Sequence, residues 1–168
     1  MPKQKAVKVP KAKASRPTPT SIKTPVEAVR DCADALYRAA EEVCYQHDRI
    51  SRILDKAPVE VELESAQKVC ELCDKSLRSL SQAYETASAV VRPMGDDEAW
   101  WKGANAVWMA SKEFLRRHRG CDISSRQFKE HGPDRLGELH ADYELEASAL
   151  LGLRHAAEAY RRTRPAAA

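Results

Sequence analysis

This sequence contains few aromatic residues and no long uncharged stretch. Phe, Trp and Tyr make up 6% of the 168 residues, and β-branched residues are also scarce, which argues against a β-rich fold. No run without a charged residue reaches ten residues, so no segment is a candidate for a membrane-spanning helix. The N-terminus also lacks the apolar segment of a secretory signal peptide. We therefore expect a helix-rich cytoplasmic protein without a membrane span.

The sequence also lacks the short motifs that mark common enzyme classes. It contains no Gly-rich phosphate loop, no G-x-S-x-G and no H-E-x-x-H. No Glu stands three residues before any of the five His residues, so the Glu-x-x-His pairs of di-metal helical bundles are missing. The five Cys residues are odd in number and do not suggest the disulfide framework of a secreted protein. We therefore predict a non-enzymatic protein with reduced thiols and no cofactor.

The net charge of +3 conceals a strong asymmetry along the chain. Residues 1–24 contain seven basic residues and no acidic one, whereas the remainder contains 21 basic and 25 acidic residues. Residues 1–24 are also rich in Pro and poor in large apolar residues, a composition that cannot offset the entropy of ordering. We predict a disordered basic tail, whose candidate anion-binding residues are Lys3, Lys5, Lys8, Lys11, Lys13, Arg16 and Lys23.

The composition of residues 1–24 resembles the Lys-, Ala- and Pro-rich tails of linker histones. That resemblance implies binding to DNA or RNA without sequence preference, through release of counterions. A second basic cluster, at Lys112, Arg116, Arg117 and Arg119, would act with the tail on phosphates. The alternatives are that the tail docks on an acidic protein, binds anionic lipid or only aids solubility.

Apolar residues alternate three and four positions apart over long stretches, as in coiled coils. The first stretch follows Thr24-Pro25-Val26-Glu27, in which Thr can cap the helix and Glu can bond back to the cap. Pro58, Pro93 and Gly95 interrupt the pattern, and we expect Gly120 to end a third helix before a capping box at Ser124-Ser125-Arg126-Gln127. The predicted helices span residues 25–54, 59–92, 96–119 and 134–163, with a short helix at 125–131.

These helices predict an all-α fold, an elongated antiparallel four-helix bundle over residues 25–164 that follows the disordered tail. Short links between the first three helices favour antiparallel neighbours. On the last helix, Leu136, Leu139, Tyr143, Ala147, Leu150, Leu153, Ala157 and Tyr160 form the predicted buried row. On the second, that row includes Cys70, Cys73, Leu77, Leu80, Tyr84 and Ala87.

Residues 44–73 have the inventory of a zinc site, C-x-x-H followed by C-x-x-C. In an antiparallel hairpin, Cys44 would lie opposite Cys70, but His47 and Cys73 would be separated by roughly 9 Å along the axis. We therefore interpret Cys44, His47, Cys70 and Cys73 as packing residues and only weak metal candidates. A redox pair or a metal enzyme built on these cysteines stays as an alternative, as does a Cys44–Cys70 crosslink on oxidation.

Three Trp residues cluster near the start of the third predicted helix. Trp101 and Trp108 are seven residues apart and should share a face, whereas Trp100 is rotated by about 100° from Trp101. One interpretation is that one indole packs inward while the other is half-exposed. The other is a protein-binding face formed by Trp100, Trp101 and Trp108, because exposed Trp is enriched at binding hot spots.

The sequence thus predicts a helical interaction or scaffold protein that binds other macromolecules, with protein partners or self-association. Its basic tail would supply electrostatic anchoring. The alternative is an accessory protein that binds nucleic acid without sequence specificity.

Overall fold

The computed structural model describes residues 24–54, 63–90 and 99–164. These residues form four α-helices: α1 (Pro25–Leu54), α2 (Leu63–Val90), α3 (Ala99–His131) and α4 (Leu136–Thr163). A 3₁₀ turn, η1 (Gly132–Arg135), connects α3 to α4. The described ranges contain no strand, so the all-helical class is confirmed. The basic tail that we expected to be disordered, and the ends of α2 and α3 predicted at 59–62, 91–92 and 96–98, lie outside the described residues.

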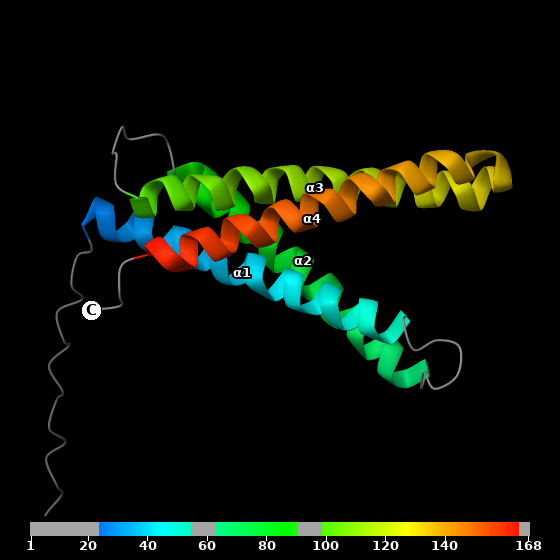
Figure 1. The fold of residues 1–168 in the computed structure, drawn as a ribbon, viewed down its shortest axis with the longest axis horizontal. Helices are drawn as coiled ribbons and strands as arrows, with labels where there is room; N and C mark the ends of the chain where they lie inside the picture. Colours follow the sequence, from blue (N-terminus) through cyan, green and yellow to red (C-terminus); the bar gives the residue numbers. More distant parts are fainter. Residues whose placement is uncertain (1–23, 55–62, 91–98, 165–168) are drawn as a thin grey trace, which may run out of the picture.

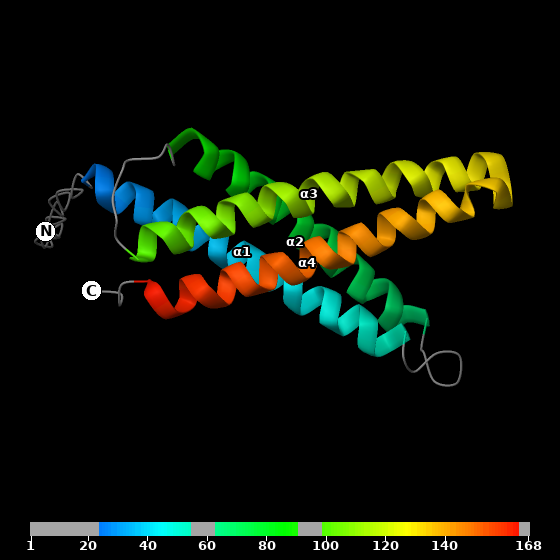
Figure 2. The ribbon, with the colours of Figure 1, turned by 45° about the horizontal axis from the view of Figure 1, so that its top comes forward.

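The helices form two antiparallel hairpins that cross each other. α1 pairs with α2 and α3 pairs with α4, and the two hairpins diverge towards the C-terminal ends of α1 and α3 (Figure 1). The second view shows the same divergence (Figure 2). The expected aligned four-helix bundle is therefore not confirmed, because the four helices run side by side over only part of their length.

The start of α1 follows the predicted capping pattern. The backbone N–H of Thr24 donates to Glu27 Oε2 at 2.7 Å, and the N–H of Glu27 donates to Thr24 Oγ1 at 3.3 Å. Two backbone donors at the helix start are thereby satisfied reciprocally. Along α1, the apolar residues Val29, Ala33, Leu36, Ala40 and Val43, spaced three or four positions apart, are buried, whereas Val26 is exposed.

The core lies where the two hairpins cross. Its fully buried side chains include Leu36 of α1, Leu80 of α2, Phe114 of α3 and Leu153 of α4. Polar contacts fasten α4 to α1 at this crossing: Tyr160 Oη donates to Asp34 Oδ1 at 2.9 Å, and Arg154 forms a salt bridge with Asp48. Burial and the Asp34 hydrogen bond raise the pKa of Tyr160, so its hydroxyl stays protonated as a donor.

The prediction that Gly120 ends a helix was wrong, because α3 is continuous from Ala99 to His131. Of the described glycines only Gly132, at φ 75°, has the left-handed conformation of a helix stop. Cys121 and Ser124 are both buried, and the Ser124 hydroxyl donates to Asp142 of α4 instead of capping a helix. Packing along α4 therefore outweighs the roughly 1 kcal/mol that Gly costs within a helix.

Two further predicted rows were partly wrong. On α2, Cys70 is exposed, whereas Val69 and Ser76 are buried. On α4, Leu136 and Tyr143 are 55% and 51% exposed. The row on α4 is covered only in its C-terminal half, because α1 diverges from α4 beyond the crossing (Figure 1). None of the described helices is long and apolar enough to cross a membrane.

Replacing Gly120 by Ala tests the continuity of α3. The added Cβ would meet only Asp142 Oδ1, at 3.9 Å, and the site has no positive φ. We expect Gly120→Ala to stabilise the protein by about 0.5–1 kcal/mol in urea denaturation. Gly103→Ala is the matched control and should destabilise, because its Cβ would lie 3.2 Å from Tyr160 Cα. Destabilisation by Gly120→Ala would indicate a helix stop at this position.

Candidate macromolecule-binding groove

A groove of about 480 Å³ runs between α2 and α3. Leu77 and Leu115 lie along it as apolar residues that also pack against the core. Tyr84 also lines it, and its ring stacks on the Trp108 ring with centroids 5.7 Å apart. The Trp108 indole N–H donates to Ser88 Oγ at 2.9 Å, so the aromatic pair is fixed between the two helices. The groove therefore has a preformed floor with apolar and aromatic side chains.

Three of the four basic residues predicted on the third helix line this groove: Lys112, Arg116 and Arg119. Arg78 joins them from α2. Arg117 lies elsewhere, in a smaller hollow between α3 and α4. The sequence offered no reason to connect Arg78 with this cluster, because it stands 34 residues before Lys112 on a different helix.

The basic residues of the groove differ in their partners. Arg116 and Arg117 both bind Glu113, each at 2.7 Å, and these hydrogen bonds lower the pKa of Glu113 to about 2. The Lys112 ammonium lies 5.8 Å from the centroid of the Trp108 ring. Among the residues that the structure describes, Arg78 and Arg119 form no ion pair. These two guanidinium groups, one on each wall, and the exposed Lys112 ammonium are positive charges available to a partner, beside the carboxylates of Glu85 and Asp122.

His118 connects the groove to a buried polar cluster behind it. Its ring lines the groove, while Nδ1 lies 2.6 Å from Glu146 Oε1 of α4. This hydrogen bond raises the pKa of His118. Burial acts to raise the pKa of Glu146, but the bonds from His118 and Cys121 outweigh it and hold that pKa below its ordinary value. The sequence did not reveal this pair, which joins two helices across 28 positions.

His118, Glu146 and Cys121 have the residue types of a nucleophilic triad but not its arrangement. The Cys121 thiol bonds to Glu146, and burial together with that carboxylate raises the thiol pKa to about 12. A reactive cysteine requires a lowered pKa beside a basic group. As arranged, Cys121 is a protonated thiol that fills the interface between α3 and α4.

The four cysteine and histidine candidates for a metal lie in different surroundings. Cys44 is buried against Arg154 of α4, Cys73 is buried beside Arg49 and Glu42 of α1, and Cys70 is exposed. The His47 ring meets Phe114 edge-on at 5.8 Å. No group of three His, Cys, Asp or Glu side chains suited to a metal ion occurs within residues 24–54, 63–90 and 99–164.

The other two Trp residues lie at the start of α3. Trp100 is buried, 8% exposed, and the Arg30 guanidinium lies 5.1 Å from its ring. Trp101 is partly exposed and meets Trp100 edge-on at 5.5 Å. The predicted Trp face is thus divided: Trp100 packs inward, Trp101 lies half-buried, and Trp108 supports the groove.

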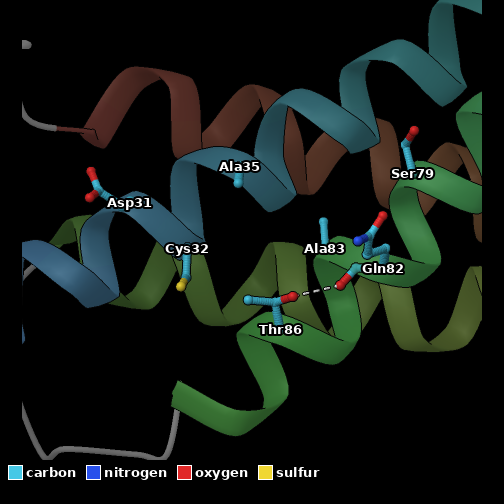
Figure 3. A pocket seen from close by; sticks show the side chains of 7 residues that line it. All are labelled: Asp31, Cys32, Ala35, Ser79, Gln82, Ala83 and Thr86. Atoms are coloured by element: carbon cyan, nitrogen blue, oxygen red, sulfur yellow. Dashed lines mark hydrogen bonds between the residues drawn. The ribbon is translucent and has the colours of Figure 1, made fainter.

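Another hollow, of about 320 Å³, lies between α1 and α2 (Figure 3). It is lined by small side chains, including Ala35, Ala83 and Cys32, and Thr86 Oγ1 donates back to the Gln82 carbonyl at 2.9 Å. It contains no basic side chain and offers little chemistry for recognition. The α2–α3 groove is therefore the stronger candidate.

The two histidines near the groove predict opposite pH dependences of stability. The raised pKa of His118 stabilises the fold below about pH 6.5, and this contribution is lost as pH rises through the folded pKa. Burial lowers the pKa of His47, despite Glu146 and Asp48 nearby. The fold therefore has its full stability from this residue above about pH 6.5, where the ring is neutral, and loses stability as pH falls and the ring of the unfolded chain becomes protonated. We expect His118→Gln to lose stability on acidification from neutral pH, and His47→Gln to gain it.

Urea denaturation of both variants between pH 5 and 8 measures these slopes. Wild-type protein should show an intermediate slope, since the two contributions oppose each other. Parallel curves for both variants and wild type would contradict the assigned environments.

Comparisons with protein-family models, curated protein sequences and solved structures found no match to this chain.

Proposed function

We propose that this protein is a non-enzymatic helical scaffold that binds an acidic, amphipathic helix of another protein in the α2–α3 groove. The observation that carries the proposal is the position of Arg78 and Arg119, which form no ion pair among the described residues and line the groove with Leu77 and Leu115. A helix docks in such a groove through apolar anchors three and four residues apart. Carboxylates flanking those anchors would meet the two guanidinium groups, which gives orientation and specificity.

A designed peptide takes the place of the partner helix in the test of this proposal. The probe is a fluorescein-labelled helix of Leu and Glu with Leu at positions i, i+3, i+4 and i+7, and its control is the same composition in scrambled order. Binding is followed by fluorescence anisotropy with the full-length protein. We expect Arg78→Glu/Arg119→Glu to weaken binding at least about tenfold, because both walls then repel the peptide. The scrambled peptide should bind less tightly than the helical one.

Arg126→Glu/Arg162→Glu is the matched control, with the same change of charge at two exposed sites outside the groove. We expect it to change the affinity by less than about threefold, a long-range effect that added salt screens. If both double variants weaken binding equally, the peptide responds to overall charge and the groove is not its site.

A second candidate function is binding of DNA or RNA, favoured by the seven basic residues in 1–24. The described residues contain 19 basic and 19 acidic side chains, so phosphate binding would depend mainly on the tail. The full-length chain with those seven residues changed to Gln isolates this contribution. If the tail binds phosphates, the affinity for a DNA duplex falls steeply with salt and is lost in this variant. Salt-insensitive or absent binding at low salt would contradict the second candidate.

A further inference from the structure

His118 belongs both to the α2–α3 groove and to the buried polar cluster behind it. Its ring lines the groove with Leu115 and Arg119, and its side chain is 29% exposed. The same ring stacks on the fully buried Phe114, with centroids 6.2 Å apart, while Nδ1 lies 2.6 Å from Glu146 Oε1 of α4. The core therefore fixes one edge of the ring, and the side chain still borders the site at which a partner helix would bind.

The hydrogen bond to Glu146 determines which ring nitrogen of His118 titrates. Despite burial, the bonds from His118 and Cys121 hold the pKa of Glu146 below its ordinary value, so this carboxylate is ionised at neutral pH and accepts the Nδ1 hydrogen. In the neutral ring Nε2 then has only a lone pair, and in the protonated ring it becomes a donor. Among the residues that the structure describes, Nε2 has no hydrogen-bond partner. Protonation thus adds a donor without breaking the bond to Glu146.

Charged groups from all four helices surround His118. The hydrogen bond to Glu146 is the main cause that raises the pKa of His118, burial opposes it, and Asp122 of α3 and Asp74 of α2 act with Glu146. His47 of α1 contacts the same Phe114 ring, and burial lowers its pKa, so it stays neutral near pH 7. The groove itself is lined by four basic and two acidic side chains: Arg78, Lys112, Arg116, Arg119, Glu85 and Asp122. An acidic partner would bring the negative charge that favours the protonated ring.

We propose that binding of an acidic helix in the α2–α3 groove is coupled to protonation of His118, whose Nε2–H then donates to a carboxylate of the partner. This inference rests on the proposed function, because the partner is the same acidic helix that Arg78 and Arg119 would bind. A carboxylate beside Nε2 meets a lone pair in the neutral ring and an N–H in the protonated ring. The partner therefore binds the protonated form more tightly, and by linkage its binding raises the pKa of His118 further.

This coupling gives the affinity a defined pH dependence. In the free protein the pKa of His118 already lies above its ordinary value of about 6.5, and in the complex it lies higher still. The affinity therefore rises as pH falls through the pKa of the complex, and it becomes constant once the free protein is also protonated. Each unit by which binding raises this pKa corresponds to a tenfold gain in affinity between those two limits.

Isothermal titration calorimetry of the full-length protein measures this dependence. The probe is the Leu/Glu helical peptide, unlabelled and blocked at both ends, because its Glu side chains stay ionised from about pH 6 to 8.5. We expect the wild-type protein to bind at least about threefold more tightly at the lower pH, and His118→Gln to change less than about 1.5-fold. His140→Gln is the matched control, since it removes an exposed His of α4 outside the groove and should keep the wild-type dependence.

Proton uptake can be measured directly on the wild-type protein. Titrations at about pH 7.5, near the range in which His titrates, are repeated in phosphate and in Tris, whose heats of ionisation differ. The difference in binding heat gives the number of protons taken from the buffer. We expect net uptake for wild type and His140→Gln with the Leu/Glu helix. We expect none for His118→Gln, and none for wild type with a Leu/Gln helix of the same spacing. Circular dichroism verifies that His118→Gln keeps its helix content.

The outcomes separate this inference from the proposed function. If the Leu/Glu helix binds wild-type protein at no pH, the proposed function fails and the coupling fails with it. If the helix binds and Arg78→Glu/Arg119→Glu weakens it, but wild type takes up no proton, the groove stands and the coupling is overturned. The coupling is also overturned if His118→Gln keeps the wild-type pH dependence, or if His140→Gln loses it equally. Should His118→Gln not fold, proton uptake with the Leu/Glu helix but not with the Leu/Gln helix supports the coupling, and equal uptake overturns it.

Discussion

Phe114→Ala should lower the free energy of unfolding by about 3–5 kcal/mol, the range for loss of a buried Phe side chain. Phe114 is fully buried at the crossing of the hairpins. Its ring contacts His47 of α1 edge-on at 5.8 Å and stacks on His118 at 6.2 Å. Truncation leaves a cavity between α1 and α3 that long, paired helices cannot close by small shifts.

Urea denaturation followed by circular dichroism measures this loss, and Phe128→Ala is the control. Phe128 is the only other Phe in the chain and lies on the same helix, where it is partly exposed. We expect the control to cost less than about 1.5 kcal/mol. A cost below about 1 kcal/mol for Phe114→Ala would mean that the hairpins do not cross at this residue.

Glu146→Ala should destabilise the protein by about 1–3 kcal/mol, the cost of leaving buried hydrogen-bond donors without an acceptor. The change removes the partner of both His118 and the Cys121 thiol. It should also lower the pKa of His118, because the hydrogen bond to Glu146 is the main cause that raises it. The variant should therefore lose the stability that wild-type protein gains from His118 below about pH 6.5.

Titration of the His118 ring by NMR and urea denaturation at about pH 6 measure both effects. Glu144→Ala is the control on the same helix, because Glu144 makes only an exposed contact with His140 at 3.5 Å. Surface pairs of this kind contribute little, so the control should stay within about 0.5 kcal/mol of wild type. An unchanged His118 pKa in Glu146→Ala would contradict the pairing.

The sequence predicted a helix end best where residues within one turn of that end determine it. Thr24, Pro25 and Glu27 define the start of α1 by chemistry that acts within one turn, and the structure confirms it. α3 also ends at His131, where the predicted short helix ends, and Gly132 beyond it has φ 75°. Gly120 and the segment from Ser124 carry equally strong local signals, yet α3 continues through both because α4 packs along it. A local helix-stop signal does not end a helix where tertiary contacts stabilise its continuation by more than a cap would.

The crossing of the hairpins could not be predicted from periodicity. An apolar row reports which side of a helix is apolar, not how far a neighbouring helix follows it. Leu136 and Tyr143 continue the α4 row without interruption, but α1 has diverged before it reaches them. The same limit applies to the groove: Arg78 and Arg119 line one groove only because α2 and α3 lie side by side. The only sign in the sequence of the His118–Glu146 pair is that Glu146 stands within the apolar part of α4.

In the proposed binding groove, Arg78 and Arg119 are charged residues of the two walls. NMR of the arginine Nε–Hε groups during titration with the Leu/Glu helical peptide tests it most directly. We predict that the Arg78 and Arg119 signals shift first and saturate together, while those of Arg126 and Arg162 stay in place. Shifts confined to Arg16 in the tail, or spread evenly over all arginines, would contradict the claim and leave only attraction between net charges.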